Sequence, residues 1–287
     1  MEVGIGLPAT IPGITRDELL AWARRAEERG FSTLATIDRL VYANLEPLVT
    51  LAAAAAVTER IRLTTDILLA PLRGNGAVLA KQAATVDAIS GGRLALGVAP
   101  GARPDDFEAA AIPYDRRGAL MDELLEEMQR VWAGEKRGFA GAIGPPVRGG
   151  GPELLVGGRV EAAFRRVARF GDGWTMGGGT PDQFREMAAR VRAAWSDAGR
   201  DGEPRLVALC YFALGDGAAE AANGYLHHYY GIAGKEVADV IAASAATDEV
   251  TVAQYRDAFA DAGADEFIYF PCSTGVSQVD LLGDVVL

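Results

Sequence analysis

Two glycine-rich turns carry the residue types and spacing in this 287-residue chain that most directly indicate ligand binding. One follows the apolar run 154–156, the other follows the run 173–176, and each leads into a helical pattern. A helix N-terminus presents unpaired N–H groups with partial positive charge, and glycines let the backbone approach an anion closely. The sequence therefore predicts a phosphate site, with ordinary loop glycines as the alternative, made by Gly157, Gly158, Gly177, Gly178, Gly179 and Thr180.

Small or polar residues also end two strands in the first third of the chain. The apolar runs 61–69 and 94–98 flank a helical pattern at 77–89, which predicts a right-handed βαβ unit. Asp66 lies near the end of the first run, and Pro100 follows the second. Because α/β sheets bind ligands at the carboxyl edge of their strands, both residues are candidates for ligand contact.

Strand and helix patterns alternate along the whole chain and predict eight strands, at 3–7, 33–38, 61–69, 94–98, 154–157, 173–176, 206–214 and 266–270. This alternation indicates an α/β fold, a (β/α)8 TIM barrel, as a single domain over residues 1–287. Insertions are expected after the fourth helix, at 133–152, and after strand seven, where two extra helical stretches occur at 218–230 and 235–246. The alternative, a doubly wound open sheet, needs a glycine-rich phosphate turn after the first strand, where GIGLPA instead runs into proline.

Composition and charge exclude several classes of partner. The net charge of −11 argues against nucleic acid and anionic membranes. No apolar segment is long enough to cross a bilayer, and the start MEVGIGLP lacks the basic n-region of a signal peptide. Cys210 and Cys272 show no metal or redox spacing, and no zinc motif or P-loop is present, so no metal site is predicted. A cytoplasmic protein that acts on a small molecule is expected.

Three segments resemble the luciferase-like flavin-dependent oxidoreductases, a family of TIM barrels: TERIRLTTDILLAP, LAKQAATVDAISGGRLALGV and VGGRVEAAFRRVARFGDGWTMGG. The family includes bacterial luciferase, flavin mononucleotide (FMN) monooxygenases and deazaflavin-dependent dehydrogenases and reductases. The resemblance covers nearly the whole chain and implies that the two glycine turns hold a cofactor phosphate. Arg159 could add a positive charge there, and a solvated helix residue is the alternative. None of the segments is specific for a substrate.

The resemblance also implies a platform for the cofactor ring at the end of the third strand. Family members often carry a non-prolyl cis peptide there, in a bulge, and the matching bond in this chain is Asp66–Ile67. The family more often has a small residue at the first of these positions. The Asp66 side chain could accept a hydrogen bond from the ring, and an ordinary trans strand is the alternative.

The candidate catalytic residues are Asp38, Arg39 and Arg103. In the resemblance Asp38 matches the acidic member of an Asp-His pair, but Arg39 stands where the histidine is expected. A guanidinium cannot act as a base near neutrality, although it can hold an anionic substrate or a developing enolate. A plain ion pair at the barrel rim is the alternative for Asp38 and Arg39. Arg103 is expected to contact substrate or cofactor, while Ala102 replaces the catalytic glutamate of the family's sugar-phosphate dehydrogenases, which argues against that activity.

The resemblance thus predicts a flavin-dependent oxidoreductase acting on an unidentified small organic substrate. The cofactor is either reduced FMN, used with oxygen for monooxygenation and supplied by a separate flavin reductase, or the deazaflavin coenzyme F420, used for hydride transfer. A flavin-free or catalytically silent barrel that binds a phosphorylated ligand is the alternative. An aldolase is disfavoured because Lys81, Lys136 and Lys235 fall on helices or in the insertion.

His227 and His228 are the only histidines, and they lie on a helical stretch with three tyrosines. One of them is a candidate acid or base on an inserted helix that could form a roof over the pocket, and an aromatic packing or dimer surface is the alternative. The helix at 46–58 carries Leu48, Leu51 and a run of alanines, and this apolar face predicts a homodimer. The alanines could instead seat the helix on its own barrel.

Overall fold

Eight parallel strands form a closed barrel in the order β1 to β8 in the computed structural model, which describes all residues from 1 to 287. The strands are β1 (Glu2–Gly6), β2 (Thr33–Thr36), β3 (Arg62–Leu69), β4 (Leu94–Ala99), β5 (Glu153–Gly157), β6 (Gly173–Met176), β7 (Arg205–Phe212) and β8 (Glu266–Pro271). Glu2 pairs with Glu266, so the first strand closes on the last. The predicted (β/α)8 barrel is confirmed.

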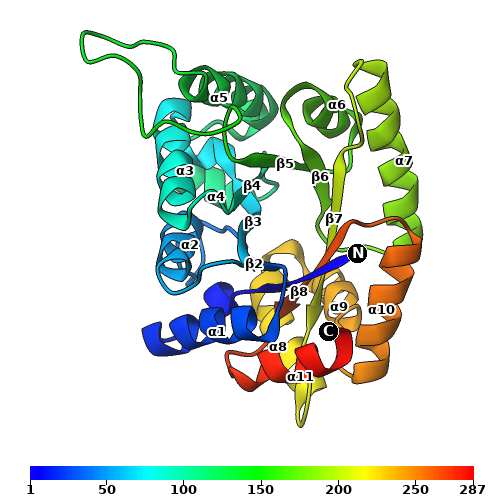
Figure 1. The fold of residues 1–287 in the computed structure, drawn as a ribbon. Coiled ribbons are helices and arrows are strands. Elements are labelled where there is room, and N and C mark those ends of the chain that lie inside the picture. The colour runs from blue at the N-terminus through cyan, green and yellow to red at the C-terminus, as the bar shows by residue number, and fades with distance from the viewer.

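Helices surround the strands as an outer layer (Figure 1). They are α1 (Arg16–Arg29), α2 (Pro47–Ala55), α3 (Gly76–Ser90), α4 (Pro104–Ala109), α5 (Arg117–Trp132), α6 (Glu161–Phe170), α7 (Pro181–Asp197), α8 (Ala218–Tyr230), α9 (Lys235–Ala243), α10 (Glu249–Asp261) and α11 (Ser277–Val286). The short helix α4 was not predicted, although Pro104 at its first position and Asp105 in its first turn favour a helix start. None of the helices is both long and apolar enough to span a membrane.

Two segments depart from the strand–helix alternation, and both lie where the sequence predicts insertions. Residues 133–152 contain no helix or strand, only an isolated bridge between Lys136 and Ala142, and they form the green loop that projects beyond α5 (Figure 1). Helices α8 and α9 lie between β7 and α10 and pack against each other. This second segment adds helical cover next to the carboxyl ends of the strands.

Local capping explains several element boundaries. Thr15 and Glu18 form the predicted capping box of α1, and Gly30 ends that helix with φ of +92°. Strand β2 ends at Thr36, two residues before the predicted end, because the Asp38 carboxylate turns to accept the N–H of Leu69 at 2.9 Å. Asp38 therefore lies in the loop after β2.

Helix α2 packs its leucines inward. Leu48 is 4% exposed and Leu51 is fully buried, so the face that was offered for a dimer contact belongs to the core of the same chain. Ala54 and Ala55 are buried as well, as in the alternative interpretation, whereas Ala52 and Ala53 are half-buried. A homodimer stays a prediction, and the one exposed residue that α2 offers it is Val49, at 69%.

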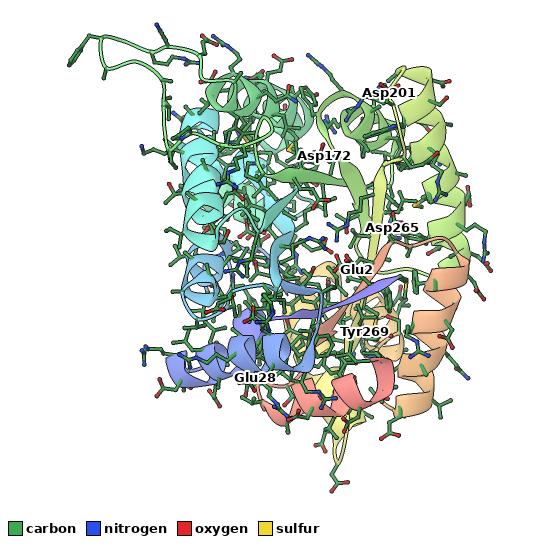
Figure 2. All side chains as sticks on the ribbon, viewed as in Figure 1. Glu2, Glu28, Asp172, Asp201, Asp265 and Tyr269 are labelled. Carbon is green, nitrogen blue, oxygen red and sulfur yellow. The ribbon has the colours of Figure 1, made fainter.

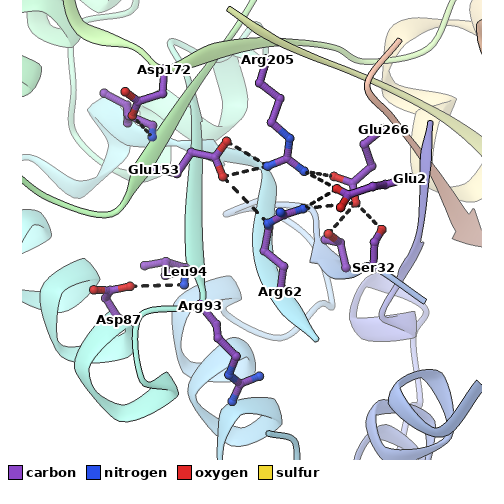
Figure 3. A network of polar contacts seen from close by, with 12 residues as sticks. Glu2, Ser32, Arg62, Asp87, Arg93, Leu94, Glu153, Asp172, Arg205 and Glu266 are labelled. Atoms are coloured by element: carbon purple, nitrogen blue, oxygen red, sulfur yellow. Dashed lines mark hydrogen bonds and ion pairs between the residues drawn. The ribbon is translucent and has the colours of Figure 1, made fainter. Parts of the chain in front are cut away.

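Charged side chains fill the amino end of the barrel interior, which we call the floor (Figure 3). Arg205 contacts Glu153 at 2.8 Å and Glu266 at 2.6 Å, and Arg62 contacts Glu2 at 2.9 Å. These five residues come from five different strands and alternate in sign, so their charges compensate one another inside the barrel.

Two aspartates hold strand starts at the same end of the barrel (Figure 2). The Asp172 carboxylate accepts the N–H of Leu154, and the Asp265 carboxylate accepts the N–H of Leu206, each at 2.8 Å. Each aspartate thus satisfies a backbone N–H donor that would otherwise lack a partner.

We expect Glu266→Ala to lower the free energy of unfolding by about 3–5 kcal/mol, because it removes one partner of a buried ion pair. Glu266 is 1% exposed, and its loss leaves Arg205 and the hydroxyl of Thr33 without this acceptor. The matched control is Glu203→Ala, whose pair with Arg192 is surface-exposed and worth less than about 1 kcal/mol. Urea unfolding of both variants measures the difference, and equal losses would contradict the role assigned to the floor.

Candidate functional site

A cavity of about 640 Å³ opens at the carboxyl end of the barrel. Six of the predicted site residues line it: Asp66, Ile67, Gly177, Gly178, Gly179 and Thr180. Asp38, Arg39, Pro100, Arg103, Gly157 and Gly158 do not. A second cavity, of about 510 Å³, lies beside the charged floor at the amino end. Because ligands bind at the carboxyl face of such barrels, we take the first cavity as the candidate site.

The turn after β6 exposes backbone to the cavity. Gly178 and Gly179 have φ of +67° and +109°, values that L side chains rarely adopt. Thr180 caps α7 by accepting the N–H of Gln183, and the Gln183 side chain accepts the N–H of Thr180. With Pro181 at the first helical position, few donors of α7 itself remain, so an anion here would bind mainly to the glycine N–H groups.

Arg159, in the turn after β5, brings a positive charge to the same turn. Its Nη2 donates to the carbonyl oxygens of Gly177 and Gly178 at 2.7 and 2.6 Å. It has no carboxylate partner, and partial burial lowers its pKa. A guanidinium with spare donors beside exposed glycine N–H groups is an arrangement suited to phosphate. No side chain caps α6, so the N-terminus next to Arg159 also keeps free donors.

Strand β3 changes register between Thr65 and Leu68, and the Asp66–Ile67 peptide is cis. The predicted bulge is therefore present, and Asp66 lies inside the barrel rather than in the helix layer. Its Oδ1 accepts a hydrogen bond from Thr175 on β6 at 2.9 Å. The pKa of Asp66 is raised to about 7, mainly because the carboxyl group is buried, and the nearby Glu266 also raises it.

Asp38 forms its ion pair with Arg73, at 2.6 Å, and not with Arg39. Burial raises the pKa of Asp38, which Arg73 opposes. Because its Oδ2 also holds the N–H of Leu69, Asp38 fixes the turn that follows β3. The structure places this carboxylate behind the bulge and away from the cavity wall.

Arg39 and Arg103 both hold the end of α8. Each donates to the carbonyl oxygen of Tyr229, at 3.3 and 3.0 Å, and Arg103 also lies over the rings of Tyr229 and Tyr230. Arg39 pairs with Asp105 and Asp106, each at 3.4 Å. The two arginines therefore anchor the helix that carries Tyr230 to the cavity.

Three tyrosines that the sequence did not single out as site residues line the cavity: Tyr211, Tyr230 and Tyr255. The hydroxyls of Tyr211 on β7 and Tyr230 on α8 lie 2.8 Å apart. Tyr211 shares an inward face with Leu209, so strand alternation could have identified it. Tyr230 belongs to the aromatic run YLHHYYG, whose interpretation as a roof over the pocket fits its position.

The histidines lie outside the cavity. His228 Nδ1 is 2.6 Å from the hydroxyl of Tyr42, and His227 Nε2 is 2.8 Å from Asp239. The carboxylate of Asp239 raises the pKa of His227. Their contacts tie α8 to the β2 loop and to α9, which agrees with a packing role.

The sequence profile of the luciferase-like monooxygenase family matches residues 1–271, which confirms the resemblance. An uncharacterized protein of Mycobacterium tuberculosis is 37% identical over 176 residues, which are 58% of this chain and 61% of that protein. The chain thus spans less than two thirds of the length of the curated relatives that it matches first.

Two solved structures share the fold over nearly all of this chain. An F420-dependent secondary alcohol dehydrogenase in complex with an F420–acetone adduct has a TM-score of 0.81 at 19% identity and covers 99% of this chain and 98% of its own. The FMN complex of the oxygenating constituent of 3,6-diketocamphane monooxygenase of Pseudomonas putida has a TM-score of 0.74 at 19% identity, with 100% and 98% covered. At these identities the likeness shows the fold alone.

We expect the stability of the ligand-free protein to fall as the pH rises through 7, because a pKa raised from 3.8 to about 7 means that the native state holds the Asp66 proton more tightly than the unfolded chain. The stabilisation that comes from the Asp66 proton is complete below about pH 4, near the unfolded-state pKa. It is lost as the pH rises through the native-state pKa of about 7. Between about pH 5 and 9 the loss is about 3 kcal/mol. Urea unfolding of wild type and Asp66→Asn across this range checks it, since the variant lacks this component; parallel curves would refute it.

Proposed function

Because the chain belongs to the luciferase-like monooxygenase family, we propose that it is an oxidoreductase that holds FMN or coenzyme F420 at the carboxyl end of its barrel and acts on a small organic substrate. One observation carries the proposal: a single cavity joins the bulge at Asp66 and Ile67 to the glycine turn and Arg159. A ring support and an anion-binding turn are the two parts that such a cofactor requires.

The residues present fit the phosphate of either cofactor. A side chain at Gly179 would meet Gln183 and Arg159, so only glycine leaves the turn open. Arg159 has no carboxylate partner in the chain, and its spare N–H groups, with those of Gly177 and Gly178, would hold the phosphate. Phosphate would thus supply the countercharge that Arg159 lacks.

The remaining walls would bind and shield the substrate. Bound cofactor supplies the hydride or electron transfer that side chains cannot perform. The paired hydroxyls of Tyr211 and Tyr230 would position a substrate oxygen, and Val240 and Ile241 of α9 would exclude water. Half of the lining residues are hydrophobic, 9 of 18, which favours a substrate that is mainly apolar with one hydrogen-bonding group.

Reduced FMN with oxygen would make the protein a monooxygenase, and a separate flavin reductase would then be its partner. F420 would make it a hydride-transfer enzyme. The named phosphate contacts serve both cofactors equally. Fluorescence titration of the purified protein with FMN and with F420 tests the proposal, and binding of neither would leave the alternative, a barrel that binds another phosphorylated ligand.

Replacing Gly178 with aspartate should weaken cofactor binding at least about tenfold, or about 1.4 kcal/mol, because it places a like charge beside the phosphate. The matched control is Gly178→Asn, which meets the same φ of +67° without the charge. Dissociation constants come from fluorescence titration. Equal effects of aspartate and asparagine would show that strain, not charge, is responsible, and would move the phosphate elsewhere.

Arg159→Gln should weaken FMN binding by about tenfold and leave riboflavin, which lacks the phosphate, unaffected. The control is Arg192→Gln, which lies on α7 outside the cavity and is paired with the exposed Glu203. Isothermal titration calorimetry measures both ligands. A parallel loss for FMN and riboflavin would contradict a phosphate contact at Arg159.

A further inference from the structure

Asp66 is a buried carboxyl group of the cavity with one free oxygen. The residue is 3% exposed and lines the cavity at the β3 bulge. Its Oδ1 is occupied by the hydroxyl of Thr175, whereas its Oδ2 is buried and has no hydrogen-bond partner in the protein. A buried polar atom without a hydrogen-bond partner costs free energy, so we expect a molecule bound in the cavity to provide a partner for Oδ2.

No cation compensates the charge that Asp66 would carry. Neither Arg159 nor Arg73 contacts Asp66, because Arg159 lies against the glycine carbonyls of the turn after β6 and Arg73 pairs with Asp38. Below Asp66 lies Glu266, a carboxylate that opposes a second negative charge. A carboxyl group in these surroundings is stabilised as the neutral acid, which has an O–H to donate.

We propose that Asp66 is present as the neutral acid and donates its O–H to an acceptor atom on the ring of the bound cofactor. The inference rests on the proposed function, because that function places a ring over the bulge. FMN and F420 both carry carbonyl and ring-nitrogen acceptors, so the assignment holds for either. The Asp66 proton would then be required for binding, and ionisation of Asp66 would weaken it.

The other groups that face the cavity do not ionise in the range where Asp66 does. Burial raises the pKa of Tyr211, of Tyr230, of Tyr255 and of Cys210, all away from neutrality, while that of Asp66 is raised to about 7. Arg159 stays charged throughout this range. Because the FMN phosphate itself ionises near pH 6, the difference in cofactor affinity between wild type and Asp66→Asn is the quantity that reports on Asp66.

The experiment is a fluorescence titration of wild type and two variants with FMN, and in parallel with F420, from pH 6 to 9. Wild-type affinity should be constant below the pKa of Asp66 and fall at least about tenfold between pH 7 and 9. Asp66→Asn keeps a neutral donor that cannot ionise, so its affinity should be flat with pH. Thr175→Val removes the hydroxyl that stabilises the carboxylate, so the fall should begin at a higher pH than in wild type.

The outcomes separate this inference from the proposed function. Cofactor binding that is independent of pH in wild type, or an equal fall in Asp66→Asn, overturns the role of Asp66 and leaves the proposed function intact. An unchanged onset in Thr175→Val also overturns it, even if Asp66→Asn does not fold. Binding of neither cofactor at any pH overturns both.

Discussion

Because the eight strands close into a barrel, all inward side chains share one interior. The change in their polarity from the floor to the carboxyl end determines what the barrel can bind. At the floor, Arg205 bridges Glu153 and Glu266 and Arg62 pairs with Glu2, so each carboxylate that fills this space has a guanidinium partner. Above it, Leu155 and Val207 belong to an apolar layer. Above that layer lies the candidate cavity, which opens where the carboxyl ends of the strands meet.

The cavity depends on the absence of side chains as much as on those present. A Cβ at Gly157 would overlap the side chain of Ile67, and one at Gly97 would overlap the carbonyl oxygen of Thr65. The bulge in β3 therefore has room only because glycines stand on β4 and β5 beside it. This close packing links three neighbouring strands to the position of Asp66 at the cavity wall.

The fold could be predicted from the sequence because each element carries its own local signals, such as the Thr15 capping box and the apolar run of β3. The glycine turn after β6 was predictable for the same reason, and the structure places it at the cavity. Asp38 and Arg39 were adjacent in sequence and were considered together, but their partners, Arg73 and Asp105, are set by tertiary packing that no local pattern encodes. Tyr230 was missed as a wall residue because its place depends on where an inserted helix docks.

The anchoring of α8 separates two halves of the cavity wall. Arg39 and Arg103 hold the carbonyl oxygen of Tyr229 on one side of the cavity. Arg159 and the glycine turn, on the other side, belong to the loops after β5 and β6. Substitutions in α9 can therefore reshape one wall without disturbing the other. During divergence from a common ancestor, mutations in this single insertion can change which small molecules such a barrel accepts. The glycine turn and Arg159 lie on other loops and can stay under separate selection.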